Sequence, residues 1–126
     1  MKSQAGYSLL ELIIVIVIIA ILAAVAIPNY LSIATRARVI AATQDVNTIS
    51  LAAGLYKLDH NGVYPNNLTQ LTAAPVAPYT QYMQYIPLDP WGTAYVISNG
   101  AIISRGADKV AGGVGVNADI VSTANL

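Results

Sequence analysis

Three oxygen-bearing side chains, those of Asp108, Asn117 and Asp119, lie in a glycine-rich stretch near the end of the 126-residue chain. Glycine allows many backbone conformations, so the carbonyls between these side chains can turn inward. Carboxylate, amide and carbonyl oxygens are the ligands that calcium takes, in sets of about 6–8 and in irregular geometry. The pattern makes a calcium site a hypothesis, although the spacing is not that of an EF-hand. A solvated glycine loop without metal is the alternative.

Glu11 is the second residue that could do chemistry, because it is the only charged residue between Lys2 and Arg36. It stands directly before 16 consecutive apolar residues, 12–27. In the first turn of a helix, the helix dipole favours an acid. In apolar surroundings a carboxylate also needs a cationic partner, since an unpaired buried charge is costly. Glu11 is therefore a candidate for an ion pair, with a role limited to its own helix dipole as the alternative.

The remaining residue types give little support for catalysis. His60 is the only histidine, and we find no nucleophile–base pair, phosphate-binding loop or haem motif. We therefore expect no enzymatic activity and a capping or solvated role for His60 at a helix end. The absence of cysteine excludes a disulfide scaffold, a thiolate zinc site and an iron–sulfur cluster. Six basic and six acidic residues give no net charge, so we expect no nucleic-acid binding.

The element that must position Glu11 is the apolar segment that follows it. Residues 7–27 are interrupted only by Ser8 and Glu11 and are long enough to cross a membrane as a single helix. A cleaved signal peptide is disfavoured, because the apolar run continues past the small residues that could form its cleavage site. A plain membrane anchor fits the length but leaves the carboxylate unexplained.

Beyond Pro28 the apolar spacing becomes that of an amphipathic helix. We predict one helix from about residue 8 to residue 58, bent near Pro28, with a second half that packs a head on one face. About 50 residues at 1.5 Å each give about 75 Å, more than one small domain covers, so an assembly is expected. Gly62 suits the left-handed turn that ends the helix. The predicted core stripe is Val39, Ala42, Val46, Ile49, Ala53 and Tyr56.

Residues 60–126 are expected to form a small α+β head. A short helix is predicted over 68–72, with an asparagine cap. Strands are predicted over 93–98 and 101–105, because the Asn-Gly pair between them favours a type I′ hairpin turn. That turn would pair residue 97 with residue 102 and residue 96 with residue 103, on opposite faces of the hairpin.

Aromatic residues are the other predicted feature of the head. The turn Asp89-Pro90-Trp91-Gly92 should place Trp91 at the rim of the core. Tyr79, Tyr82 and Tyr85 recur at every third position. We expect these rings to pack the head and touch neighbouring subunits. An aromatic array for adhesion or charge transfer is the alternative.

The N-terminal pattern resembles the type IV pilin family, which includes the pseudopilins of type II secretion. Members carry a short polar leader ending in glycine, then an aromatic residue, a glutamate at the fifth mature position and an apolar helix. Here these are Met1 to Gly6, Tyr7, Glu11 and 12–27. The resemblance implies that a prepilin peptidase cleaves between Gly6 and Tyr7 and N-methylates Tyr7. The new amine would then be the cation that pairs with Glu11 of a neighbouring subunit and sets the register of the filament.

The C-terminal half resembles the major pseudopilins within that family, through DPWGTAY, the strand pair and SRGADKVAGGVGVNADI. In them the glycine loop binds calcium, which implies the ligands Asp108, Asn117 and Asp119. Lys109 stands where glycine is usual, and the usual terminal tryptophan is absent. Asn117 stands where aspartate is common, so the site loses one charge and we expect weaker affinity.

These resemblances imply a structural subunit of a type II secretion pseudopilus, a helical homo-oligomer that drives protein export across the outer membrane. The implied partners are the prepilin peptidase, the inner-membrane assembly platform and minor pseudopilins. The implied location is the bacterial inner membrane, crossed once, with the head in the periplasm and the filament in the periplasm or at the cell surface. The expected division is a leader over 1–6, a helix over 7–59 with its hydrophobic segment at 7–28, and a head over 60–126. The alternative is a type IV pilin for adhesion, motility or DNA uptake, a class that often carries a C-terminal cysteine pair.

Overall fold

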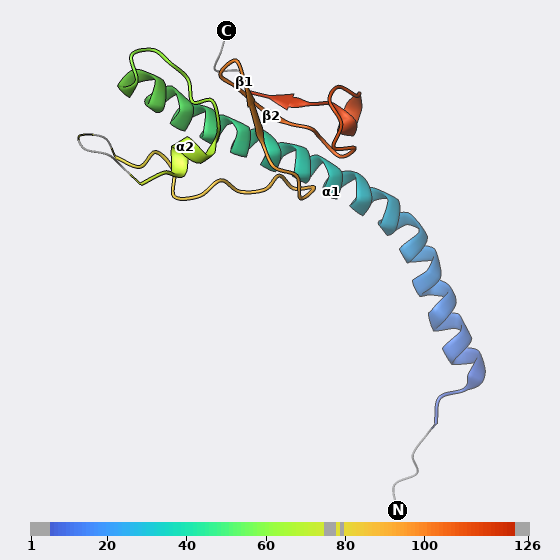
Figure 1. The fold of residues 1–126 in the computed structure, drawn as a ribbon. Coiled ribbons are helices and arrows are strands. Elements are labelled where there is room, and N and C mark those ends of the chain that lie inside the picture. Colours follow the sequence, from blue (N-terminus) through green and yellow to red (C-terminus); the bar gives the residue numbers. More distant parts are fainter. Residues whose placement is uncertain (1–5, 75–77, 79, 123–126) are drawn as a thin grey trace, which may run out of the picture. The chain divides into compact units, whose positions relative to one another are not determined.

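The computed structural model describes residues 6–74, 78 and 80–122. It has the predicted α+β composition, with one long helix and a small antiparallel sheet (Figure 1). The chain divides into two compact units, residues 1–35 and residues 36–126. In chain order the elements are α1 (Leu9–Asp59), α2 (Thr69–Thr72), β1 (Val96–Ser98), β2 (Ala101–Ser104), the 3-10 helix η1 (Gly115–Asn117) and β3 (Ile120–Val121).

The first unit is the apolar start of α1. The helix begins one residue after the predicted position and also ends one residue later, at Asp59. Pro28 lies inside the helix and does not terminate it. A proline removes one backbone hydrogen bond and loosens the preceding turn. The bend expected near Pro28 stays a prediction.

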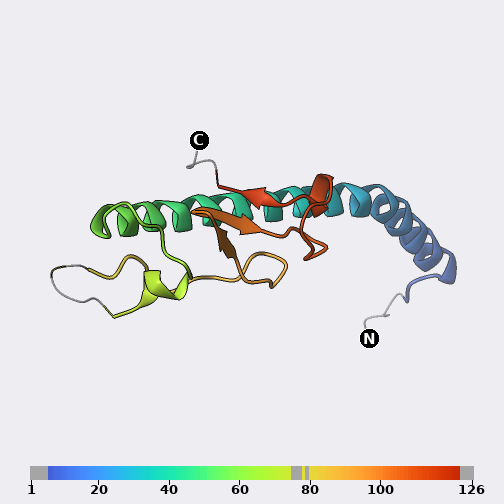
Figure 2. The same cartoon turned by 45° about the horizontal axis from the view of Figure 1, so that its top comes forward.

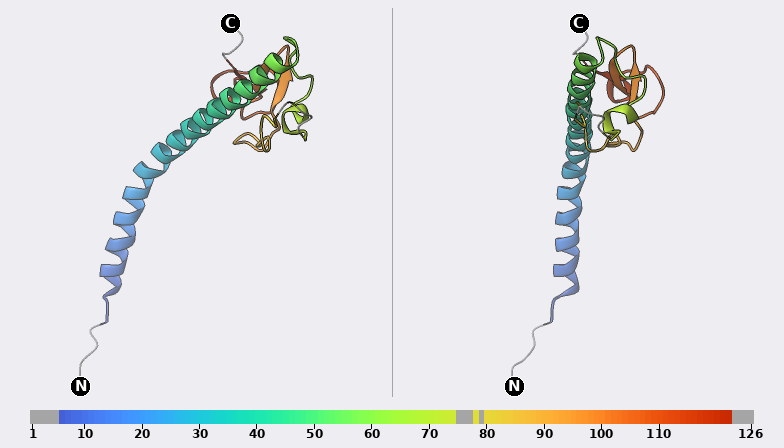
Figure 3. Two further views of the ribbon diagram at one scale, coloured as in Figure 1. Left: turned by 90° about the vertical axis from the view of Figure 1, so that its left-hand side faces the viewer. Right: turned by 60° about the vertical axis from the view of Figure 1, so that its left-hand side comes forward.

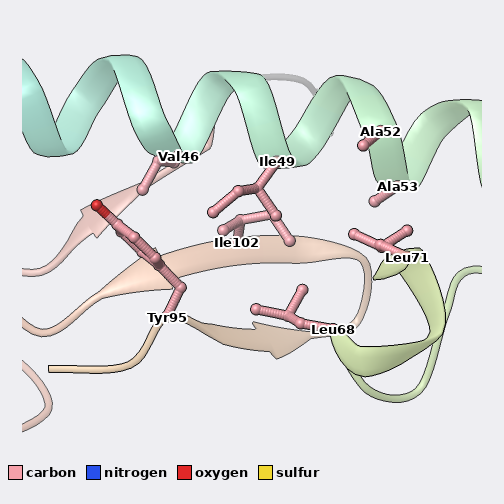
Figure 4. Packing of buried hydrophobic residues seen from close by; sticks show 8 residues of the cluster. All are labelled: Val46, Ile49, Ala52, Ala53, Leu68, Leu71, Tyr95 and Ile102. Carbon is pink, nitrogen blue, oxygen red and sulfur yellow. The ribbon is translucent and has the colours of Figure 1, made fainter. Parts of the chain in front are cut away.

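The second unit is built on residues 36–59 of α1, which pack against the sheet and α2 (Figures 2 and 3). The predicted stripe is confirmed as the buried face of this segment, with Val39 and Tyr56 half-buried at its two ends. The exposed side of the segment carries polar side chains together with Ile40, Leu51, Leu55 and Leu58, so the helix is amphipathic only in part. Figure 4 shows the resulting core, which consists of Val46, Ile49, Ala52, Ala53, Leu68, Leu71, Tyr95 and Ile102.

The predicted stop at the end of α1 is also confirmed. Gly62 has a φ of 85°, and its N–H donates to the carbonyl of Lys57 at 2.9 Å. Such a left-handed residue satisfies a carbonyl that the helix end would leave without a donor. Asn61 before it is left-handed as well, with a φ of 54°.

The short helix is present, but its predicted cap is wrong in detail. Helix α2 starts at Thr69, and the N-cap position is held by Leu68, which makes no side-chain cap hydrogen bond. Asn67 lies one residue earlier, and its side-chain oxygen accepts from the Thr69 N–H at 3.0 Å. Gln70 reaches back to accept from the Asn66 N–H at 2.8 Å. The side chains of Asn67 and Gln70 therefore accept hydrogen bonds from N–H groups at the start of α2, in place of a side chain at the N-cap position.

The sheet has the order β1-β2-β3 and the predicted hairpin register, with Val96 opposite Ile103 and Ile97 opposite Ile102. Both turn residues have positive φ, 50° at Asn99 and 84° at the glycine, as a type I′ turn requires. The first strand is shorter than predicted, because residues 93 and 94 bond back to residues 88 and 89. Strand β3, which pairs with β2, was not predicted.

Candidate functional site

The Gly6–Tyr7 bond lies ahead of α1 in an exposed segment without regular structure. The Tyr7 side chain is 85% exposed. The first hydrogen bond of the helix start runs from the Leu12 N–H to the Ser8 carbonyl at 3.2 Å. Glu11 therefore lies in the first turn, as predicted, and its side chain is exposed. The arrangement leaves both the peptide bond and the carboxylate accessible to other molecules.

The apolar segment that follows Glu11 is exposed rather than packed against other described parts of the chain. Every large apolar side chain from Leu12 to Ile27 is at least 45% exposed. By length and composition α1 contains a stretch that is apolar enough to cross a membrane. Soluble proteins rarely expose contiguous apolar surface of this extent. The segment therefore needs a membrane or other protein chains around it.

The glycine-rich loop folds back on itself through main-chain hydrogen bonds. The Ala107 N–H donates to Val116 at 3.1 Å, and the Asp119 N–H donates to Gly112 at 3.1 Å. Gly113 has a φ of 86°, and a Cβ at this position would collide with the Asn117 carbonyl oxygen. Glycine is required there by both conformation and close approach.

The structure gives the three predicted ligands different surroundings. Asp108 is exposed, and its Oδ1 accepts from the Val110 N–H at 3.1 Å. Asn117 is exposed at the end of η1. Asp119 is half-buried, and its Oδ2 accepts from the Gly112 N–H at 3.0 Å. Within the described part of the chain, no three His, Cys, Asp or Glu side chains form a group that could hold a metal.

One atom of this loop fits a cation directly. Asp119 Oδ1 is buried and has no hydrogen-bond partner. A buried carboxylate oxygen without a donor is costly, and a hard cation would satisfy it. The second oxygen of Asp108 and the amide of Asn117 supply ligand chemistry of the same kind. The chemical type of these ligands suits calcium, with one charge fewer than three aspartates would give.

A buried carboxylate that the sequence analysis missed supports this loop. Asp89 is only 4% exposed. Its Oδ1 accepts from the N–H groups of Trp91 at 3.1 Å and Thr93 at 2.7 Å, and its Oδ2 accepts from the Ser104 hydroxyl at 2.8 Å. Ser104 Oγ in turn accepts from the Gly106 N–H at 3.4 Å, where the loop begins. The available signal was the position of Asp89 before Pro-Trp-Gly, which is typical of an Asx turn.

The predicted aromatic residues divide into packed and exposed ones. Trp91 is half-buried at the turn, in agreement with its predicted rim position. The Tyr82 ring packs against the core, and its hydroxyl donates to Asp59 at 2.8 Å. Tyr85 is 69% exposed, so the structure does not place it in the core of its own head. Tyr79 lies outside the described residues.

His60 has the capping role expected of it. Its Nδ1 lies 2.9 Å from the Tyr56 carbonyl, one of the last carbonyls of α1. The imidazole also stacks on the Tyr56 ring, with ring centroids 3.8 Å apart. The only histidine of the chain therefore closes a helix end and joins an aromatic cluster.

A long-range hydrogen bond joins the residue before β1 to α1. The Tyr95 hydroxyl, from the residue before β1, donates to Asp45 Oδ2 at 2.8 Å. Burial, followed by the hydrogen bond and negative charge of Asp45, raises the pKa of Tyr95 well above its usual range. Asp45 is half-buried beside the buried stripe of α1, where the tyrosine hydroxyl reaches it.

An exposed Gly-aromatic bond, an acid in the first helical turn, an apolar helix and a small α+β head together define the pilin-like class. In agreement, residues 1–27 match the prokaryotic N-terminal methylation motif. The chain belongs to the family described as type II secretion system (T2SS), protein G, which it matches over residues 29–123. Members of this family are structural pseudopilins and are not known as enzymes.

Individual relatives agree with this assignment. A type II secretion system core protein G from Pseudomonas aeruginosa is 34% identical over an alignment of 135 positions, gaps included, which covers 94% of each chain. Another from Vibrio cholerae is 36% identical, over 95% of this chain and 92% of that protein. A fimbrial protein from Pseudomonas aeruginosa is 47% identical over 53 residues, but these are only 34% of that protein. The similarity to these two secretion proteins covers 94–95% of the chain, whereas the similarity to the fimbrial protein covers 42% of it.

Proposed function

We propose that this chain polymerises through the apolar segment of α1 into a pseudopilus that drives protein export across the outer membrane. The observation that carries the proposal is the uncovered apolar surface from Leu12 to Ile27, preceded by Glu11 as its only charge. Before assembly this surface would lie in the inner membrane, with the head in the periplasm. After assembly it would pack against the same segment of other copies.

Processing by a prepilin peptidase precedes assembly in this proposal. The peptidase would cleave the exposed Gly6–Tyr7 bond and methylate the new amine of Tyr7. This amine would lie one helical turn from Glu11 of its own chain and at matching depth to Glu11 of a neighbour. Pairing across subunits would neutralise both charges inside an apolar bundle and fix the axial register.

Calcium is the proposed ligand of the glycine-rich loop. Bound calcium would have a structural role, because its positive charge would attract the oxygen ligands of the loop. Asp119 would hold it through the buried Oδ1, while Oδ2 keeps the Gly112 N–H in place. Asp108 and Asn117 would complete the side-chain ligands. The loop would then be held by the ion as well as by its own main-chain hydrogen bonds.

Replacement of Gly6 tests this function at its first step. Gly6→Trp should block cleavage, because the peptidase would meet a bulky side chain at the scissile bond. Unprocessed chain should then collect in the membrane, and no filaments should form. Mass spectrometry of wild-type filaments that still carry Met1 to Gly6 would contradict the proposed processing.

The observation that favours the alternative function, a type IV pilin, is the partial match to the fimbrial protein. A gene disruption separates the two functions. Loss of this chain should stop the release of exported proteins into the medium and leave surface pili and motility unchanged. The reverse result, normal export with lost pili, would favour the pilin.

A further inference from the structure

At Ile97, the main-chain N–H and C=O groups point outward from the edge of the sheet. β1 is an edge strand in the order β1-β2-β3, and Ile97 lies opposite Ile102. The Ile102 N–H donates to Ser122 Oγ at 3.0 Å, and its carbonyl accepts from the Ser122 N–H at 2.9 Å. Both groups of Ile102 are thus used on the β3 side. In an antiparallel ladder such a residue belongs to a non-hydrogen-bonded pair, so the N–H and C=O of Ile97 face outward.

The hairpin turn gives the same result independently. In a two-residue hairpin the flanking pair, here Ser98 and Ala101, is hydrogen-bonded, and the pairs alternate from there. Ile97 is the next residue along β1. Within the described part of the chain, no group donates to Ile97 or accepts from it across the outer edge.

A groove follows this edge, between residues 63–68 and β1, and we name it the β1 groove. It consists of two adjoining cavities of about 390 Å³ and 210 Å³, both lined by Asn66 and Ile97. Tyr64 and Leu68 form parts of its far wall. No charged residue lines either cavity. The groove therefore offers the outward N–H and C=O of Ile97 beside a neutral wall of apolar and asparagine side chains.

β1 is a short edge strand of three residues, but it has no charge, proline or bulge that would block strand pairing. Natural edge strands commonly carry lysine, proline or a bulge that prevents another strand from adding. β1 has the sequence Val-Ile-Ser and pairs regularly with β2 over all three residues. A strand of this kind is a template for main-chain pairing, and the adjoining groove leaves room for one.

We propose that the β1 groove binds an uncharged extended segment of another protein by β-strand addition. One residue of the incoming segment would accept from the Ile97 N–H and donate to its carbonyl, and alternate side chains would enter the groove. The neutral lining selects apolar or small polar side chains. Edge-to-edge pairing with a second copy would be two-fold symmetric and closed, which does not fit a filament that grows in one direction.

The probe for this proposal is a capped peptide of alternating threonine and valine, added to the isotope-labelled full chain in detergent micelles. Amide hydrogen exchange measured by NMR should slow at Ile97 by about tenfold or more at millimolar peptide. Exchange at Ile102, already bonded to Ser122, should not change. The same peptide N-methylated at every residue should have no effect, because it cannot donate to the Ile97 carbonyl and its methyl groups keep it away from the strand edge. Unchanged exchange at Ile97, or an equal effect of both peptides, would overturn the proposal.

Variants of the edge test the same point. Ile97→Pro removes the outward N–H without removing a β1–β2 hydrogen bond and should weaken peptide binding about tenfold or more. Ile97→Val keeps the N–H and should bind like the wild type. If the proline disturbs the fold, Asn66→Trp fills the groove from its far wall and should also block binding. Slow exchange at Ile97 in filaments of this chain alone would assign the groove to a second copy and overturn the proposed foreign strand.

Discussion

The Ser104 hydroxyl donates to the Asp89 carboxylate at 2.8 Å, and both side chains are buried. These residues lie 15 positions apart, one in a turn and the other at the end of β2. The same carboxylate also holds the turn, and the same hydroxyl holds the first N–H of the glycine-rich loop. The pair therefore joins the hairpin to the loop that carries the proposed calcium ligands.

Removal of this carboxylate should be costly. Asp89→Ala leaves two half-buried N–H groups and one buried hydroxyl without an acceptor, so we expect a loss of about 3 kcal/mol or more in unfolding free energy. Ser104→Ala should cost about 1–2 kcal/mol. Urea denaturation of the full chain in detergent measures both. Ser98→Ala, at an exposed serine of β1, is the control and should stay within about 0.5 kcal/mol of the wild type. An Asp89→Ala variant as stable as that control would contradict the network.

Substitution at Glu11 should separate processing from assembly. Glu11→Ala should still be cleaved after Gly6 but should form few filaments, because the amine of a neighbouring Tyr7 loses its partner. Glu11→Asp should be intermediate, since its side chain is shorter. Filament yield by sedimentation, with mass spectrometry of the N-terminus, measures the two steps. A normal yield from Glu11→Ala would show that the ion pair is dispensable.

Calcium should stabilise the head against unfolding. A ligand that binds only the folded state adds about 2.7 kcal/mol at a hundredfold excess over its Kd. The melting temperature should therefore be higher in calcium than in chelator. Asp108→Ala or Asp119→Ala should abolish the difference, and Asn117→Asp should enlarge it by restoring a charge.

The control for the calcium prediction is Asn47→Asp, which adds the same charge at an exposed position of α1. It should leave the calcium response unchanged. A melting temperature indifferent to calcium from the micromolar to the millimolar range would leave only the solvated loop.

Lys109 should be replaceable with a gain in stability. Its φ of 64° lies in the left-handed region, which costs a residue with a Cβ roughly 1 kcal/mol relative to glycine. Lys109→Gly should therefore raise the unfolding free energy in chelator by up to about 1 kcal/mol. Ala111→Gly, at a neighbouring residue without positive φ, should lower it instead. Equal effects of the two glycines would show that the left-handed backbone carries no strain.

Because of the Tyr95–Asp45 hydrogen bond, we expect the free energy of unfolding to fall at alkaline pH. Because the pKa of Tyr95 is raised in the folded state, the folded chain holds this proton more tightly than the unfolded one. Its contribution is complete below the ordinary tyrosine pKa of about 10 and falls as the pH rises beyond that value. Urea denaturation between pH 8 and 11 should show this loss. Tyr95→Phe should be less stable at pH 8 by about 1 kcal/mol and should show a shallower alkaline decline.

Much of the fold could be predicted because its signals are local. The apolar run of α1, its amphipathic stripe and the Asn-Gly turn each depend on residues a few positions apart, where helix or strand periodicity decides which side chains share a face. The same holds for Glu11, whose place in the first turn follows from the start of the apolar run. The ligand types in the glycine-rich loop are equally visible in the sequence.

What only the tertiary structure decided are contacts between distant segments. Asp89 is an ordinary turn residue in the sequence, and its burial depends on Ser104 arriving from β2. The short strand β3 has no periodicity of its own and exists because β2 offers an edge. The outward N–H of Ile97 follows from how Ile102 is bonded on its other side. In each case a polar group is satisfied or exposed by a partner far along the chain, and no local pattern specifies that partner.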